Sequence, residues 1–273
     1  MATLITSPVR HISSAPAVQL EDVSVRFHDH FALRDVTFEL PPSMNLAVVG
    51  PNGAGKTTLF QVIAGMLKPT TGMVEVYGYK PGGHVCIAYV PQRSQVDWDF
   101  PVTVTEVVMM GRIRKIGLFN WPRRNDWDLV QTLLERVGLV DLDKRQIGEL
   151  SGGQQQRVFL AQALAQEAEL ILLDEPLTGL DLPSQEAILE ILDDFREEEV
   201  TVLVATHDLD MAAQHFDRVM LLNRELVSYG KPTEALTSSS LLTAYGAHMH
   251  TLEEEGGVVI LSDPCAEEED GCN

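Results

Sequence analysis

Short apolar runs alternate with segments of helical spacing along most of the chain. Strand-length apolar runs occupy 44–49, 73–77, 85–90, 169–173 and 201–205, and helical spacing fills 56–67, 152–166 and 184–196. Apolar residues three and four apart form one face of a helix, whereas short unbroken runs are typical of strands buried on both faces. The alternation predicts an α/β domain with a mainly parallel sheet.

This alternation is interrupted between about residues 101 and 150. Residues 104–110 and 128–137 have helical spacing, and no strong strand run separates them. We therefore expect a helical insertion within one domain that spans residues 18–247, with a last pair of strands at 219–222 and 226–228. Residues 1–17 are predicted to form a small, polar, disordered arm, and residues 248–273 an acidic tail with little hydrophobic periodicity.

Composition and charge argue against a membrane-spanning, a secreted or a nucleic-acid-binding protein. No apolar run approaches the roughly 18–20 residues of a membrane helix, and the first residues lack the apolar core of a signal peptide. The formal net charge of −20 would repel a phosphate backbone, so a nucleic acid is not expected as partner. The cysteines form no CxxC pair and no disulfide framework, which fits a reducing cytoplasm.

A glycine-rich turn follows the first of the buried runs. Its sequence, Gly50-Pro51-Asn52-Gly53-Ala54-Gly55-Lys56-Thr57, matches the pattern G-x-x-x-x-G-K-[ST] between a strand and a helix. Glycines let backbone N–H groups wrap around phosphates, and the amino end of the following helix adds to the anion site. We expect nucleotide binding over Gly50–Thr58, with Lys56 at the β- and γ-phosphates and the Thr57 hydroxyl on Mg²⁺.

Two adjacent carboxylates end a later apolar run. The segment Leu170-Ile171-Leu172-Leu173 leads directly into Asp174 and Glu175. Taken alone, two acids after a strand indicate only a solvated turn. With the phosphate-binding turn upstream, Asp174 suits a second ligand of Mg²⁺, and Glu175 suits a group that orients or deprotonates the attacking water.

The segment Leu150-Ser151-Gly152-Gly153-Gln154-Gln155-Gln156-Arg157 resembles the signature sequence of ABC-type ATPases. Other motifs of that family follow in order: Gln92 at the Q-loop, Thr178-Gly179-Leu180-Asp181 at the D-loop, and His207 as the switch histidine after a strand. The resemblance covers roughly residues 18–247. It implies a P-loop NTPase fold of ABC type, with an antiparallel β part and a helical insertion beside the parallel sheet.

The resemblance also implies roles and a dimer. Gln92 would reach Mg²⁺ or the attacking water, and His207 would contact the γ-phosphate. Ser151, Gly152, Gly153 and Gln154 begin a helix, which is a second anion-binding end that one ATP does not require from the same chain. The family's arrangement is a head-to-tail dimer in which these residues and Asp181 close on the partner's ATP. We expect a homodimer.

The adenine contact is less defined by the sequence. The family stacks the base on an aromatic residue after the first strand, and Phe27 occupies that place in Val23-Ser24-Val25-Arg26-Phe27. Phe27 also alternates in phase with Val23 and Val25, so a core position remains the alternative. His28 and Phe31 are further candidates for the stacking residue.

The absence of a coiled-coil insertion and of a second phosphate-binding turn favours a transporter subunit over family members that act on DNA or ribosomes. Such a subunit would lie at the cytoplasmic face of the membrane, held by integral permease subunits and working with an extracytoplasmic substrate-binding protein. Residues 88–112 resemble the manganese, zinc and chelated-iron importer group. Import of another cargo, or a nucleotide switch without turnover, remain alternatives, although Glu175 argues against the switch.

The aromatic and acidic run Asp97-Trp98-Asp99-Phe100 has two interpretations. The resemblance implies that the permease contacts the chain around Val96–Val107, where aromatic residues would serve as anchors. Alternatively, Trp98 and Phe100 pack the insertion onto the main domain. In the tail, His248, His250, Cys265 and Cys272 match no standard metal-site spacing, so a solvated tail is expected rather than a metal-buffering one.

Overall fold

The computed structural model describes residues 15–81, 87–117, 120–246, 249–254 and 257–262. Its six-stranded sheet has the order β5-β6-β7-β3-β8-β9. The strands are β3 Asn45–Val49, β5 Ile87–Val90, β6 Leu170–Asp174, β7 Thr201–Thr206, β8 Arg218–Asn223 and β9 Glu225–Gly230. Neighbouring strands pair in parallel, except that β9 runs antiparallel to β8 at the edge. The expected mainly parallel sheet is confirmed.

Both faces of this sheet are buried, which explains its unbroken apolar strands. In β6, Leu170 and Leu172 pack toward helix α1 (Lys56–Ile63) and a second sheet, whereas Ile171 and Leu173 pack toward the other helices. Successive side chains of a strand point to opposite faces, so one strand supplies two cores. The functional residues at the ends of these strands therefore sit on a rigid base.

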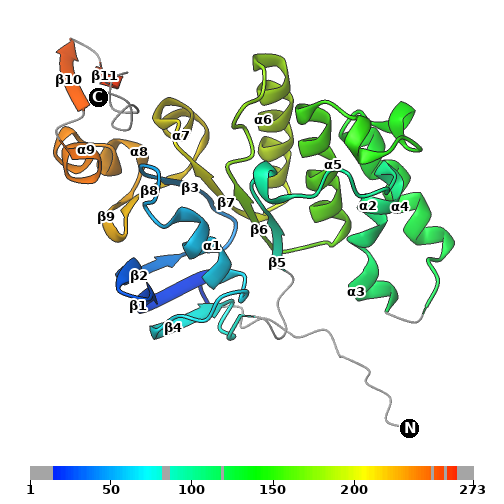
Figure 1. Ribbon diagram of the computed structural model, residues 1–273, viewed down its shortest axis with the longest axis horizontal. Helices are drawn as coiled ribbons and strands as arrows, with labels where there is room; N and C mark the ends of the chain where they lie inside the picture. Colours follow the sequence, from blue (N-terminus) through cyan, green and yellow to red (C-terminus); the bar gives the residue numbers. More distant parts are fainter. Residues whose placement is uncertain (1–14, 82–86, 118–119, 247–248, 255–256, 263–273) are drawn as a thin grey trace, which may run out of the picture.

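The second sheet is antiparallel, with the order β2-β1-β4. Its strands are β1 Val18–Phe27, β2 His30–Leu40 and β4 Thr71–Val76. Helix α1 lies between this sheet and the large one (Figure 1), and it contacts strands of both. The antiparallel part of the expected fold is thus confirmed. Strand β2 was not expected from the sequence.

The helical insertion is a group of short helices beside α5 (Gly152–Ala165) at one end of the molecule (Figure 1). The group comprises α2 Val104–Met110, α3 Ile113–Ile116 and α4 Arg124–Arg136, with single turns η1 Arg93–Gln95, η2 Val140–Leu142 and η3 Ile147–Glu149. Thr103 and Glu106 form a capping box that starts α2, which satisfies amide groups that the first turn leaves without partners. The apolar faces of α2 and α4 pack on α5.

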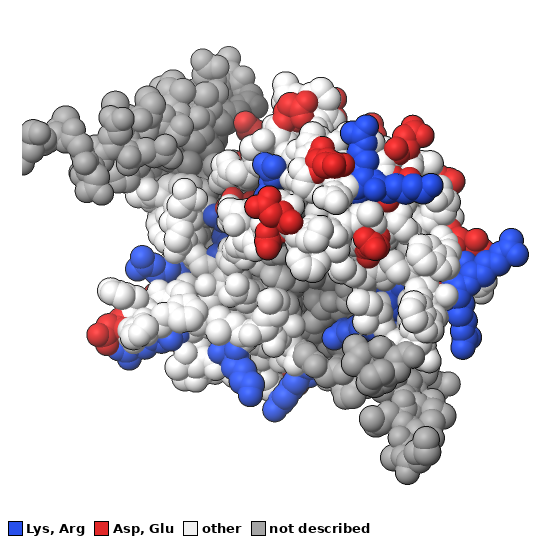
Figure 2. Space-filling model, turned by 45° about the vertical axis from the view of Figure 1, so that its right-hand side comes forward, with Lys and Arg blue, Asp and Glu red and all other residues white. Residues whose placement is uncertain are grey.

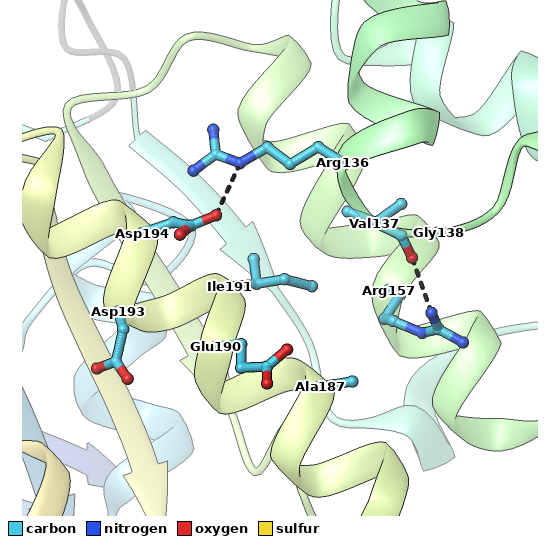
Figure 3. A pocket seen from close by; sticks show the side chains of 9 residues that line it. All are labelled: Arg136, Val137, Gly138, Arg157, Ala187, Glu190, Ile191, Asp193 and Asp194. Carbon is cyan, nitrogen blue, oxygen red and sulfur yellow. Dashed lines mark hydrogen bonds and ion pairs between the residues drawn. The ribbon is translucent and has the colours of Figure 1, made fainter.

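A cavity of about 510 Å³ marks the place where the insertion is tied to α6 (Leu182–Glu197). Figure 3 shows its lining of Arg136, Val137, Gly138, Arg157, Ala187, Glu190, Ile191, Asp193 and Asp194. Arg136 forms ion pairs with Asp194 (3.2 Å) and Glu198 (2.8 Å). Arg157 donates to the carbonyl oxygen of Val137 at 2.8 Å, and burial lowers the pKa of its guanidinium. Arg157, the last residue of the signature segment, therefore joins α5 to the end of α4.

The two ends of the chain differ from expectation. Ala17, assigned to the arm, is buried, and its amide donates to Leu40 at 2.8 Å. After α7 Leu209–His215, α8 Pro232–Ala235 and α9 Ser238–Tyr245, part of the expected tail forms an antiparallel hairpin of β10 Met249–Glu254 and β11 Gly257–Ser262. The continuous apolar run of β11, residues 258–261, favours a strand and explains one side of this hairpin. His250 lies in β10, whereas His248, Cys265 and Cys272 lie outside the described residues.

Within the described ranges, none of the helices has both the length and the apolar character that crossing a membrane requires. On the face shown in Figure 2, basic side chains occur in several separate places with acidic ones among them. The charge on this face is therefore mixed in sign.

Candidate active site

The glycine-rich turn connects β3 to α1, as expected. Gly55 precedes α1 with φ of 98° and leaves the start of the helix without a side-chain cap. A Cβ on Gly55 would lie 2.4 Å from the Ala32 oxygen, and one on Gly50 would lie 2.0 Å from the Leu222 oxygen. Because a positive φ and such close approaches both require glycine, the turn is held open by its sequence. Uncapped amide groups at the amino end of a helix form a site for an anion.

Lys56 folds back over this turn. Its Nζ donates to the carbonyl oxygens of Gly50 at 2.8 Å and Pro51 at 3.3 Å, and it lies 3.8 Å from Oε1 of Glu175. Lys56 is only 6% exposed. Burial lowers the pKa of Lys56, and the nearby carboxylates Glu175 and Asp174 oppose this effect. The turn thus carries a buried cation beside its open amide groups.

Asp174 lies beneath the turn at the end of β6 and is 1% exposed. Burial raises its pKa, whereas hydrogen bonds from Thr57 and Tyr89 lower it and the charge of Glu175 raises it further. The Tyr89 hydroxyl donates to Oδ2 of Asp174 at 3.3 Å. Burial, followed by the charge of Asp174, raises the pKa of Tyr89. Thr57 and Asp174 therefore lie close together, as the sequence predicted.

Glu175 stands at the point where β6 ends. Its φ of 50° is left-handed, which costs a non-glycine residue about 1–2 kcal/mol. Its Oε2 accepts a hydrogen bond from Nε2 of Gln92 at 2.9 Å and one from the Thr178 hydroxyl at 3.4 Å. Strained residues of this kind concentrate at functional sites. Gln92 and Glu175, which the sequence analysis assigned separately to the hydrolytic site, are thus in direct contact.

A cleft of about 1020 Å³ brings most of the predicted residues together. Its lining is Phe27, Ala32, Pro51, Asn52, Gly53, Ala54, Gly55, Lys56, Thr57, Thr58, Gln92, Glu175, Thr178, His207 and Tyr245. Gly50 and Asp174 are not among the lining residues, although the Gly50 oxygen accepts from Nζ of Lys56 and Asp174 is buried beside Glu175. His207 follows β7, and Gln92 follows β5. The cleft therefore collects residues from the ends of four neighbouring strands, β5, β6, β7 and β3, the usual place for ligands in such sheets.

Two aromatic residues flank the cleft. Phe27 is 49% exposed, so the alternative that it belongs to the core is wrong; its role in stacking on a base remains a prediction. Tyr245, at the end of α9, was not anticipated from the sequence. Its hydroxyl is buried without a hydrogen-bond partner, and burial raises its pKa to about 12. The further candidate Phe31 lines a different cavity.

The signature residues are not part of this cleft. Ser151 caps α5: its hydroxyl accepts from the Gln154 amide at 3.3 Å, and the Gln154 side chain accepts from the Ser151 amide at 3.0 Å. Ser151 is exposed. A Cβ on Gly153 would lie 2.3 Å from the Ser184 hydroxyl, so α6 packs against this turn. Asp181, in the segment before α6, is likewise absent from the lining of the cleft.

Arg93 connects the Gln92 segment to α5. Its Nε donates to the Gln155 side chain at 3.0 Å, and its guanidinium lies 5.7 Å from the centre of the Trp98 ring. Trp98 packs edge-on against Phe159 with centroids 5.6 Å apart. Its Nε1 donates to the Arg93 oxygen at 3.0 Å. Trp98 is thus a packing residue, whereas Phe100 remains 56% exposed. Of the two interpretations, packing holds for Trp98 only.

Comparisons with known proteins agree with this arrangement. A family model described as "ABC transporter" matches residues 33–178. The manganese transport system ATP-binding protein MntB of Halalkalibacterium halodurans is 43% identical over 249 residues, which cover 90% of this chain and 99% of that protein. The zinc transport system ATP-binding protein TroB of Treponema pallidum is 42% identical and covers 87% and 90%. A chain from an inward-facing ABC transporter assigned to the metal-chelate type superposes with a TM-score of 0.79 at 30% identity, covering 90% and 97%.

Proposed function

Because the chain belongs to the ABC transporter family as an ATP-hydrolysing subunit, we propose that it energises the import of a transition metal, either manganese, zinc or chelated iron. The cargo rests on relatives named for manganese and zinc transport that align over nearly their whole length. The channel is a separate integral permease, and an extracytoplasmic binding protein delivers the metal. The chain itself works at the cytoplasmic face of the membrane, held there by the permease.

The donor set at the floor of the cleft fits Mg²⁺ bound together with nucleotide. Thr57, Asp174 and Gln92 offer a hydroxyl, a carboxylate and an amide oxygen, the hard donors that Mg²⁺ prefers. Among the described residues, no cluster of three or more His, Cys, Asp or Glu side chains suits a metal ion. Mg²⁺ is normally held by one or two carboxylates plus substrate phosphates, so this site requires ATP to be complete.

We assign the hydrolytic roles from the contacts of Glu175. The carboxylate lies in the same cleft as Lys56 and is held by Gln92 at 2.9 Å. Lys56 and the open amide groups of the turn bind the phosphates, while Glu175 accepts a proton from the attacking water. Bound Mg²⁺ supplies neutralisation of phosphate charge. His207, which also lines the cleft, contacts the γ-phosphate and senses its presence.

The position of the signature residues supports a head-to-tail homodimer. The lining of the cleft includes none of Ser151–Gln154 and not Asp181, although Ser151 is exposed at the amino end of a 14-residue helix. A second copy brings these groups onto the ATP of the first, so that two nucleotides bridge the subunits. Hydrolysis then removes the contacts of the γ-phosphate, so that the dimer closed by ATP opens.

The permease contact is assigned to the surface around Val96–Val107. Phe100 is the exposed aromatic residue of this segment, and exposed aromatics are typical anchors of protein interfaces. Trp98 contacts Arg93 and Phe159, and Phe159 belongs to α5. The proposed contact surface is therefore packed against the helix that begins at the signature residues.

The experiment for the cargo is reconstitution of the chain with its co-purified permease and binding protein. Vesicles are given Mn²⁺, Zn²⁺ or chelated iron, with an amino acid and a sugar as controls. We expect ATP-dependent accumulation of a metal. Accumulation of an amino acid or sugar but of no metal would overturn the cargo. Metal uptake without ATP consumption would overturn the proposed energising role.

A further inference from the structure

Tyr89 shares a face of the large sheet with the predicted magnesium ligands. In the parallel pairing of β5 with β6, Tyr89 lies opposite Leu172, two residues before Asp174. Ile87 and Tyr89 pack with Leu170 and Leu172 on the side of the sheet that α1 covers. Because side chains alternate along a strand, Asp174 points to this same side. The phenol is thereby brought under the amino end of α1, where Thr57 lies.

The hydrogen bond between Tyr89 and Asp174 joins two elements that are distant in sequence. The hydroxyl donates to Oδ2 of Asp174 at 3.3 Å, and the partners are 85 residues apart. The Thr57 hydroxyl hydrogen-bonds the same carboxylate. The Thr57 oxygen has lone pairs for a cation while its proton is donated to Asp174. Thr57 and Tyr89 therefore hold the carboxylate together, and Tyr89 is the donor that has no contact with the cation itself.

The other tyrosines on the two sheets show what a purely structural phenol does here. Tyr229 donates to the backbone oxygen of Glu39 at 2.9 Å, and Tyr77 donates to the backbone oxygen of Glu169 at 2.9 Å. Both bind carbonyl groups and so join strands. Tyr89 instead binds a carboxylate that is 1% exposed and lies behind the nucleotide cleft.

On the basis of the proposed function, we infer that Tyr89 is a positioning residue for Mg²⁺ of the bound nucleotide. By occupying Oδ2, the phenol fixes the plane of the Asp174 carboxylate and leaves the other oxygen for the cation. Outer partners that orient a ligand in this way typically change metal affinity by about 10- to 100-fold. Tyr89 does not touch the phosphates, since it is absent from the lining of the cleft.

The test is the Mg²⁺ dependence of nucleotide binding by the full chain, read from the fluorescence of an N-methylanthraniloyl ATP. Parent and Tyr89→Phe are titrated with Mg²⁺ at fixed nucleotide, and each is also measured in EDTA. The phenylalanine keeps the ring and its packing. We expect the Mg²⁺ midpoint of Tyr89→Phe to rise about 10-fold, with nucleotide affinity in EDTA unchanged. Tyr229→Phe, which also loses one phenolic hydrogen bond, is expected to keep the parental midpoint.

The outcomes separate this inference from the proposed function. An unchanged Mg²⁺ midpoint in Tyr89→Phe overturns the positioning role while the magnesium site itself stands. An equal loss of nucleotide affinity with and without Mg²⁺ also overturns it, because a structural defect does not distinguish the two conditions. If the parent binds nucleotide with no response to Mg²⁺, both the magnesium site and the role of Tyr89 are wrong.

Discussion

The amino ends of α1 and α5 carry the two glycine-rich motifs of the chain, and they are built in opposite ways. Gly55 starts α1 without any side-chain cap, beside the buried cation of Lys56. Ser151 starts α5 with a complete capping box formed with Gln154, on an exposed surface. Both ends have amide groups directed outward. Only the first keeps them free for a ligand within its own chain.

The amino end of α1 is a permanent anion site, because one chain alone provides it. The amino end of α5 is a conditional site, because only the proposed dimer brings a phosphate to it. At α1 the amide groups face a cleft that the same chain completes with Gln92, Glu175 and His207. At α5 the Ser151 and Gln154 side chains satisfy amide groups themselves, which makes the exposed end stable in water. In the proposed dimer, the phosphate that α5 contacts comes from the nucleotide of the second subunit. On this proposal, formation of the dimer depends on bound nucleotide.

The largest expected effect comes from removing the cation of the permanent site. Lys56→Ala deletes the charge and also the bonds to Gly50 and Pro51 that hold the turn. Charge-assisted contacts contribute about 1.5–3 kcal/mol each, so we expect Mg·ATP affinity to fall by at least about 100-fold. Isothermal titration calorimetry measures this, with the exposed Lys68→Ala as control. Parental affinity in Lys56→Ala would refute the assignment of the phosphate site.

The second largest effect is expected for Glu175→Gln, and it involves the amino ends of both α1 and α5. Glu175→Gln keeps the shape of the side chain but removes the proposed base, which should lower hydrolysis by about 10²- to 10⁴-fold. ATP then persists between the phosphate turn of one subunit and the signature of the other. We expect this variant to elute as a dimer from a sizing column when ATP is present. Glu135→Gln, on the exposed side of α4, should hydrolyse ATP normally. Hydrolysis by Glu175→Gln at the parental rate would mean that another group is the base.

Much of this comparison is visible in the sequence, because both motifs are local. The glycines and Lys56 were predicted from the spacing of the pattern G-x-x-x-x-G-K-[ST], and Ser151 from the resemblance of its segment to the ABC signature. Parallel strands were also predictable from their apolar runs. In contrast, Tyr89 acts on Asp174 across 85 residues, and Tyr245 reaches the cleft only because α9 packs beside β8 and β9. Such contacts arise from the tertiary arrangement and leave no local signal.

Two further differences have similar physical causes. Trp98 and Phe100 look equivalent in the sequence, but Phe159 and Arg93 lie where only Trp98 reaches them. Strand β2 was missed beside β1, whose pairing contains several register shifts. Such irregularities break the simple alternation by which a half-buried antiparallel pair is recognised. In the tail, the acidic composition drew attention away from the apolar run of β11. At these positions, the local sequence alone does not indicate the structure that tertiary packing produces.

The smallest expected effect is that of removing the helix cap at the conditional site, the amino end of α5. Ser151→Ala removes the cap of α5, which should cost about 1 kcal/mol of unfolding free energy. Nucleotide affinity of the separate chain should remain parental, because Ser151 does not line its cleft. In the Glu175→Gln background, however, the same change should reduce the ATP-dependent dimer on the sizing column.

Thr103→Ala is the matched control, since Thr103 caps α2 with the same kind of capping box. It should lower stability by a similar amount and leave the dimer intact. If both alanine variants weaken the dimer equally, the loss reflects a weakened fold, and the amino end of α5 has no part in binding the partner's nucleotide.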